Sequence, residues 1–237
     1  MQLNSIPTEL AIALTNVPLG LVALFGMLWV WCQRALNPLK AAIWAFMFGC
    51  LAIGSDLAIF VHGFELEPET SKLLWRVIYA ALTLTVACFA AGAVFDRWGT
   101  AATWRTVPGL LIVGAAFFYV ANFRSHNFLP FIIYETAAML LSLAVYARLA
   151  VKRQLGGAGW MAAGILITIA AAAFQATRIV SFTLVMPFNH NAVYHLVQLP
   201  GLLCLIIGLR RSFQIQSDDK TPALDKLAGK SRTTFAS

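Results

Sequence analysis

The sequence predicts an all-α integral membrane protein folded as a seven-transmembrane-helix bundle, and three observations lead to that class. Of the 237 residues, 60% are hydrophobic and 11% are charged, whereas about 25% of the residues in an ordinary soluble domain are charged. The hydrophobic residues fall into seven long runs, and each run can reach across ~30 Å of hydrocarbon. The runs lack the two-residue alternation of membrane β-strands. This composition excludes a soluble enzyme, a disordered regulator and a coiled coil.

The seven runs set the expected order of helices along the chain. They cover approximately residues 10–32, 41–64, 73–95, 106–123, 128–150, 158–184 and 191–211. Residues that break helices lie in the short connections, at Asn37-Pro38, Pro68, Trp98-Gly99, Gly156-Gly157 and Pro187. The first run has no basic segment before it and is longer than the core of a signal peptide, so we expect it to be a span. Residues 1–211 are therefore expected to form one transmembrane domain.

The lysines and arginines predict the orientation of the bundle. Thirteen of the 17 fall on one side, in the connections after the first, third and fifth runs and in the C-terminal tail. Because cytoplasmic loops carry the excess of positive charge, we expect the N-terminus outside and the C-terminus in the cytoplasm, in the plasma or inner membrane of the cell. The polar tail, residues 212–237, is expected to be disordered, because it has too little apolar surface to offset the entropy of ordering it.

The net charge of +7 does not indicate nucleic acid as a partner. The basic residues lie at the ends of apolar runs and in the tail, and they do not form a stripe with interleaved aromatic residues. We therefore expect membrane lipid around the helices, and a lipid-like or small-molecule ligand as the partner of a site inside the bundle.

The seventh run carries a polar face. Asn191, His195 and Gln198 share one side of this helix, because residues at i, i+4 and i+7 lie on the same face. With the expected orientation, all the histidines of the chain fall on the outer side of the membrane, including His126 before the fifth run and His190 at the start of the seventh. These residues are the first indication of a site at the outer end.

The second run adds a second polar face. Ser55 and His62 are seven residues apart and therefore share a side of the helix. Asp56 follows Ser55 and lies about 120° away from His62 around the helix axis.

The fifth and sixth runs carry further polar side chains, and depth links them to the others. Gln175 and Arg178 neighbour each other in the sixth run, three residues apart. Four ionisable residues lie ~6–12 Å below the outer ends of their helices at 1.5 Å per residue: Asp56, Glu135, Arg178 and His195. An ionisable group at that depth costs several kcal/mol if it faces lipid. The sequence therefore predicts one shared polar pocket in the outer half of the bundle.

Each of these residues also has a purely structural interpretation. Arg178 can pair with Glu135 or Asp56 as a bridge that fixes helix packing. His195 can be a buried histidine that is hydrogen-bonded to a neighbouring helix, and His62 can be an interfacial residue at the end of its helix.

The pattern resembles a superfamily of seven-helix membrane hydrolases that includes the alkaline ceramidases and the progestin and adiponectin receptors. The resemblance implies a zinc ion held by a histidine late in the second helix, which His62 matches, and by two histidines early in the seventh, one of which His195 matches. It implies a serine before the first histidine, and Ser55 precedes His62 by two turns where the family has one. The implied reaction is hydrolysis of a lipid amide. Asn191 stands where the family has its other histidine, with His190 one residue away, and no aspartate opens the third run.

Independently of that resemblance, His62, His195 and one carboxylate offer three zinc ligands with an open position for water. The bound water would attack a carbonyl carbon of a lipid amide or ester. Glu135 or Asp56 would act as the general base in this hydrolysis. Arg178 or Gln198 would polarise the carbonyl oxygen.

Two further classes of function remain open. The pocket of a non-catalytic protein would bind a ligand and signal to the cytoplasmic side, or would carry a solute or proton, although the cytoplasmic halves hold few of the polar groups that a transport path needs. Alternatively, His62 and His195 would hold a b-type haem as axial ligands on facing helices.

Overall fold

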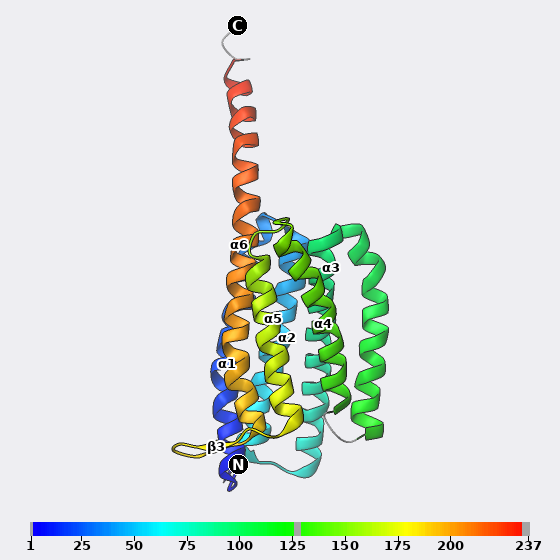
Figure 1. Ribbon diagram of the computed structural model, residues 1–237, viewed down its shortest axis with the longest axis vertical. Helices are drawn as coiled ribbons and strands as arrows, with labels where there is room; N and C mark the ends of the chain where they lie inside the picture. Colours follow the sequence, from blue (N-terminus) through cyan, green and yellow to red (C-terminus); the bar gives the residue numbers. More distant parts are fainter. Residues whose placement is uncertain (1, 126–128, 234–237) are drawn as a thin grey trace.

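The protein is a bundle of long helices in the computed structural model, which describes the backbone of residues 2–125 and 129–233 and the side chains of residues 2–124 and 129–214. The helices lie side by side along the long axis (Figure 1). They are α1 (Pro7–Cys32), α2 (Pro38–Gly63), α3 (Pro68–Val120), α4 (Leu129–Val151), α5 (Ala158–Thr177) and α6 (His190–Thr233). Six helices within the described residues are long and apolar enough to cross a membrane. The predicted helical fold with long apolar helices is thereby confirmed.

Short elements connect the helices. A 3-10 turn, η1 (Gln33–Ala35), follows α1, and a π-helical turn, η2 (Ala121–Ser125), follows α3. Strand β1 (Gln2–Leu3) pairs antiparallel with β2 (Phe64–Glu65), which ties the N-terminal segment to the end of α2.

Helix α3 contains the predicted run at residues 73–95 and most of the one at 106–123, whose last three residues lie in η2. Its backbone leaves the helical conformation at Gly99, where φ is 77° and ψ is −170°. A side chain would be strained in this region, which is essentially restricted to glycine. The two halves of α3 on either side of Gly99 run next to each other in opposite directions (Figure 1). The break therefore lies where the Trp98-Gly99 pair predicts it.

The predicted sixth run, residues 158–184, is too long. Helix α5 ends at Thr177, and Arg178 takes a left-handed conformation with φ of 56°. Strand β3 (Phe182–Thr183) then pairs antiparallel with β4 (Pro187–Phe188), with the rings of Phe182 and Phe188 stacked 5.0 Å apart. The segment after Thr177 is rich in β-branched and aromatic residues, which suit a hairpin as well as they suit an apolar helix.

The predicted seventh run, residues 191–211, agrees with the part of α6 that is apolar enough to cross a membrane, His190–Gln214. Helix α6 itself continues to Thr233. The helical backbone extends beyond the rest of the bundle into the polar C-terminal segment (Figure 1).

Helices α5 and α6 approach each other closely through paired glycines. A Cβ atom on Gly164 would lie 2.7 Å from the backbone oxygen of Gly201, and one on Gly208 would lie 3.0 Å from the backbone oxygen of Gly157. Within each helix segment the two glycines are seven residues apart, so both fall on the contact face. Small residues of this kind let helix backbones pack closely in membranes.

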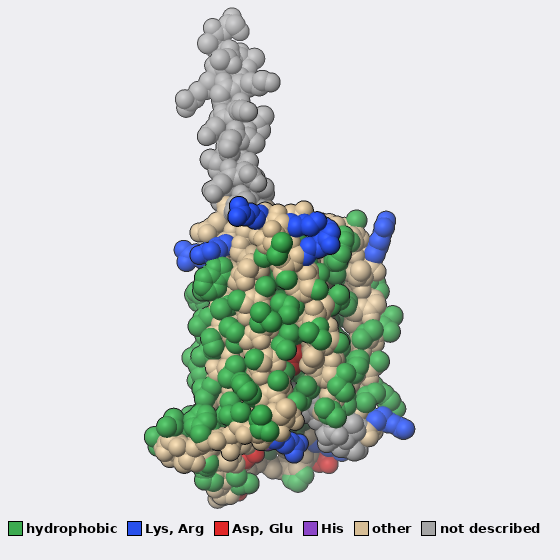
Figure 2. Space-filling view, viewed as in Figure 1, with side chains coloured by type: hydrophobic (Ala, Val, Ile, Leu, Met, Phe, Trp, Pro, Cys, Tyr) green, Lys and Arg blue, Asp and Glu red, His purple; other side chains and the backbone are tan. Residues whose placement is uncertain are grey.

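A buried ion pair joins α2 to α3 at the opposite end from the N-terminus. The Lys40 Nζ atom lies 2.6 Å from Asp96 Oδ1, and the two side chains are 0% and 2% exposed. Tyr146 on α4 donates a hydrogen bond of 2.8 Å to Asp96 Oδ2. Lys40 is one of the basic residues between the first two apolar runs, and it lies at that end of the bundle with its side chain buried. Other Lys and Arg side chains do lie at the two ends of the bundle, with hydrophobic side chains between them (Figure 2).

Candidate functional site

One large cavity opens at the end of the bundle that carries the N-terminus. Its volume is about 1090 Å³, and side chains from all six long helices line it. The lining includes exposed residues such as Lys72 and Arg178, so the cavity reaches the molecular surface. The structure brings nine of the predicted site residues to its wall: Ser55, His62, Glu135, Gln175, Arg178, His190, Asn191, His195 and Gln198.

His62, at the end of α2, is held by α1. Its Nδ1 atom lies 2.6 Å from Glu9 Oε2, so the imidazole donates a proton or shares it with this carboxylate. The edge of Trp75 on α3 packs against the ring at 5.4 Å between centroids, and Asn4 Nδ2 donates to the His62 carbonyl oxygen at 3.1 Å. These contacts hold the imidazole ring in place. Because Glu9 contacts Nδ1, the Nε2 atom of the neutral ring keeps a lone pair that Glu9 does not use.

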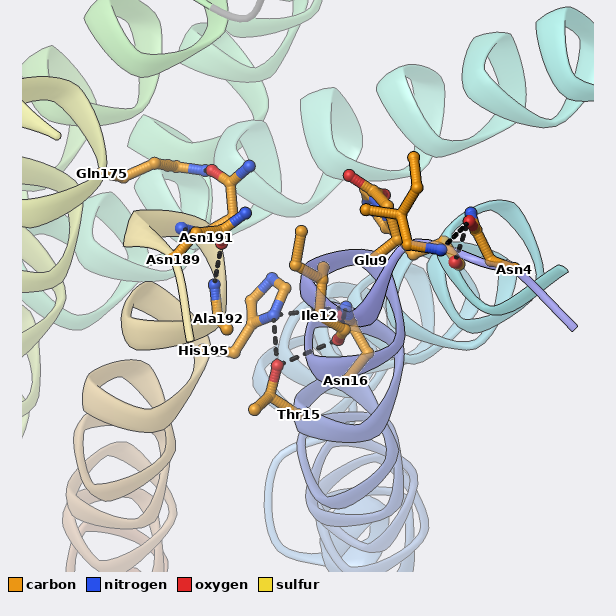
Figure 3. Close-up of polar contacts among 12 residues, drawn as sticks. Asn4, Glu9, Ile12, Thr15, Asn16, Gln175, Asn189, Asn191, Ala192 and His195 are labelled. Atoms are coloured by element: carbon orange, nitrogen blue, oxygen red, sulfur yellow. Dashed lines mark hydrogen bonds and ion pairs between the residues drawn. The ribbon is translucent and has the colours of Figure 1, made fainter. Parts of the chain in front are cut away.

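His195, near the start of α6, is also held by α1. Its Nδ1 atom lies 3.0 Å from Thr15 Oγ1 and 3.2 Å from Asn16 Nδ2. Asn16 Nδ2 donates its other hydrogen to the carbonyl oxygen of Ile12 at 3.0 Å. The Thr15 hydroxyl also donates to the carbonyl oxygen of Ile12 at 2.9 Å. Nδ1 can therefore accept from Asn16 Nδ2 or donate to Thr15 Oγ1, and these contacts are compatible with the ring proton on either Nδ1 or Nε2. Figure 3 shows the ring between α6 and α1, with Nε2 turned away from Thr15.

Glu135 on α4 is buried, with 5% of its surface exposed. Tyr194 on α6 donates to its Oε1 atom at 3.3 Å, whereas Oε2 has no hydrogen-bond partner among the described residues. Burying a carboxylate with one weak hydrogen bond and no cation costs free energy, unless the group is protonated or receives a partner.

Two glutamine side chains present further acceptors to the cavity. Gln175 Nε2, at the end of α5, donates to Asn191 Oδ1 at 3.2 Å, which leaves Gln175 Oε1 as the free end of the amide. Gln198 on α6 is 8% exposed. Within the described residues, neither Oε1 atom has a hydrogen-bond partner.

The start of α6 is ordered by a cap that the sequence analysis did not use. Asn189 Oδ1 accepts from the backbone nitrogens of Asn191 and Ala192 at 3.0 and 3.1 Å (Figure 3). Such a cap satisfies amide groups that the first turn of a helix leaves free. It holds His190 and Asn191 at the cavity wall.

Asp56 does not join the site, so its predicted place in the pocket is wrong. Its side chain is exposed on the outside of the bundle, where the carboxylate packs against Gly20 of α1. Ser55 and His62 face the cavity, and each residue along an α-helix is rotated by about 100° from the one before it. Asp56 follows Ser55 and is therefore turned away from the cavity.

Arg178 lines the cavity but does not form the predicted bridge. It is the C-cap residue that follows α5, and its side chain is exposed. In the described part of the chain the ion pairs are Lys40 with Asp96 and Glu9 with His62. His126, the remaining histidine, lies outside the described residues.

The described residues do not gather the predicted zinc ligands into one cluster. His62, His190 and His195 all line the cavity, yet no group of three His, Cys, Asp or Glu side chains among the described residues is close enough together to hold a metal ion.

Three residues of α1 that contact the two histidines were missed by the sequence analysis: Glu9, Thr15 and Asn16. Of these, Asn16 also lines the cavity. Glu9 and Asn16 are seven residues apart, the same spacing that identified Ser55 with His62. The signal was therefore present in the first run.

These features define the class of the protein. It is a helical bundle with long apolar helices of the kind found in multi-pass membrane proteins, and at one end it has a large cavity lined by both polar and apolar side chains. The chain belongs to the family of unknown function DUF6962, whose family model matches residues 11–214. No curated protein and no solved structure matches the chain.

Proposed function

We propose that the protein is a seven-span membrane protein that binds a small or lipid-like ligand in its outer cavity without transforming it. The two halves of α3 on either side of Gly99 supply two of the spans. An odd number of spans puts the chain ends on opposite faces, and the excess of Lys and Arg near the C-terminal end supports a cytoplasmic C-terminus. The host would be the plasma or inner membrane.

One observation carries this proposal, namely the set of unpartnered acceptor oxygens in a single large cavity. They are Oε2 of Glu135 and the Oε1 atoms of Gln175 and Gln198. Leaving a buried polar group without a hydrogen bond costs about 1–3 kcal/mol. A volume of about 1090 Å³ is at the upper end of the range of ligand pockets. A ligand with hydrogen-bond donors would satisfy these atoms.

The proposal is tested by filling the cavity. Ala58 lines it, whereas Ala173 on α5 is exposed on the outside of the bundle and does not line it. We expect native mass spectrometry of the full chain, released from mild detergent, to show a bound organic molecule at one per chain. The molecule should be absent from the Ala58→Phe variant and retained by the Ala173→Phe variant. Equal adducts on all three proteins, or none on any, would reject the proposal.

Zinc-dependent hydrolysis of a lipid amide or ester is the second candidate function. The pair of Glu9 and His62 favours it, because a carboxylate on the other nitrogen is the usual support of a metal-bound histidine. A haem between His62 and His195 is a third.

Elemental analysis and an absorbance spectrum of the purified protein separate these candidates. Ligand binding alone predicts neither stoichiometric zinc nor a Soret band. One zinc ion per chain that is lost in a His62→Ala variant would favour zinc-dependent hydrolysis over ligand binding. A Soret band that is lost in a His195→Ala variant would favour haem binding.

A further inference from the structure

The inner wall of the cavity needs hydrogen-bond donors. Glu135 and Gln198 are each more than nine-tenths buried, and each presents an oxygen that no described residue contacts by a hydrogen bond. The free Gln175 Oε1 adds a third acceptor from a third helix. A primary ammonium group has three N–H donors, no acceptor and a positive charge. It therefore matches two amide oxygens and a carboxylate better than a hydroxyl or an amide group does.

The cavity also carries positive charge. Lys72 and Arg76 on α3, together with Arg178 after α5, line it, and none of the three forms an ion pair in the described part of the chain. The Arg76 guanidinium lies over the ring of Phe123 at 5.5 Å. A ligand with a positive charge alone would be repelled by these cations, and a ligand with a negative charge alone would leave the acceptors of the inner wall bare.

The remaining lining is apolar. Met47, Leu51, Phe89, Leu202 and Leu205 contribute to the wall, and they come from the parts of their helices that lie farther from the N-terminal end of the bundle. Such a surface takes up hydrocarbon, because burying apolar area away from water is favourable.

We propose that the ligand is a zwitterion with an apolar part, whose primary ammonium group contacts Glu135, Gln175 and Gln198 and whose anionic group contacts Lys72, Arg76 and Arg178. This inference rests on the proposed function, since it names the ligand class of the same cavity. The chemistry is shared by two sources, an apolar amino acid from solution and an aminophospholipid from the bilayer.

Paired probes test the ammonium group and distinguish the two sources. The soluble pair is L-phenylalanine and N-acetyl-L-phenylalanine, which keeps the carboxylate and lacks the ammonium group; binding to the full chain in micelles is measured by calorimetry. The lipid pair is phosphatidylethanolamine and phosphatidylcholine, whose quaternary ammonium has no N–H donor; binding is measured by native mass spectrometry in direct competition. We expect one primary amine to bind about ten- to a hundredfold more tightly than its partner, as hydrogen bonds to charged groups predict. If neither pair discriminates, the inference is wrong.

Variants then locate the two ends of the ligand. Glu135→Gln keeps the side-chain volume and removes the charge, so the preference for the primary amine should disappear. Arg178→Gln, at an exposed residue that folding tolerates, should weaken binding of the preferred probe about tenfold. Arg124, exposed in η2 and outside the lining, is the matched control, and Arg124→Gln should leave affinity unchanged. Equal effects of Arg178→Gln and Arg124→Gln would overturn the assignment of the anionic end.

The outcomes separate this inference from the proposal on which it rests. A molecule that Ala58→Phe displaces and that lacks a primary amine would leave ligand binding intact and refute the zwitterion. Absence of any bound molecule and of any probe binding would refute both.

Discussion

The buried pair of Lys40 and Asp96 gives the sharpest test of the packing. Both side chains are removed from water, and the Nζ–Oδ1 distance is 2.6 Å. Asp96→Asn keeps the shape of the side chain and an oxygen that accepts from Tyr146, but it leaves the Lys40 ammonium without a counter-charge. The Lys40 Nζ atom also lies 5.3 Å from the Phe213 ring, which is too weak a partner to replace a carboxylate.

The expected magnitude follows from this geometry. Removing one partner of a buried ion pair costs about 3–5 kcal/mol, whereas replacing both partners by apolar residues of similar volume is often neutral. We therefore expect Asp96→Asn to lower the free energy of unfolding by about 3–5 kcal/mol. Combining Lys40→Met with Asp96→Leu should recover most of that loss, so the two changes should be strongly non-additive.

The free energies are measured by titrating the purified full chain in mixed micelles with sodium dodecyl sulfate and following helix content. Arg105 is exposed, so Arg105→Gln serves as the charge-removing control and should change stability by less than about 0.5 kcal/mol. The reasoning fails if Asp96→Asn changes the free energy of unfolding as little as this control does. It also fails if the double variant loses as much free energy of unfolding as Lys40→Met and Asp96→Leu lose when they are measured singly and added.

Three further predictions use the same protein preparation. Gly164→Ala should destabilise by about 1–3 kcal/mol through overpacking, because the new Cβ atom would lie 2.7 Å from the Gly201 carbonyl oxygen, whereas Gly159→Ala meets nothing within 4 Å and should not destabilise. Gly99→Ala should lower the free energy of unfolding by about 1–3 kcal/mol because of the strained backbone at this position, while alanine in place of the helical Gly109 should be neutral or stabilising. Both glycine predictions are measured by detergent titration of the variant and its control. Equal effects of a variant and its control would contradict the corresponding prediction. A green fluorescent protein fused to the C-terminus should fluoresce and a phosphatase fused there should be inactive, and the reverse pattern would refute the proposed orientation.

The sequence contained most of the information on where helices lie, and less on where they end. The Gly99 break could be predicted because glycine and charged residues interrupt two apolar runs. The end of α5 could not, because Ile179 to Val185 is as apolar as the helix before it. Hydropathy measures transfer from water to hydrocarbon, and it does not separate a helix from a hairpin made of the same residues.

The candidate site could be predicted as far as single-helix geometry allows. Spacing along one helix placed Ser55 with His62, and Asn191 with His195, on faces that meet at the cavity. The contacts of Glu9 with His62 and of Asn16 with His195 depend instead on how α1 is rotated against α2 and α6. That rotation is set by packing between helices, which no spacing within one helix contains.

The two ends of the bundle are held together by different interactions, and this difference bears on ligand binding. At the end away from the N-terminus, the contact of Gly157 with Gly208 and the buried pair of Lys40 and Asp96 involve residues that do not line the cavity. At the cavity, α1 is joined to α2 and α6 by polar contacts of His62 and His195, and both rings lie in the cavity wall. A ligand in the cavity is therefore positioned next to the side chains that hold α1 against α2 and α6. Because a ligand that binds only the folded chain stabilises it by about 2.7 kcal/mol at a hundred times its Kd, detergent titration also detects ligand binding, and Ala58→Phe should abolish that gain.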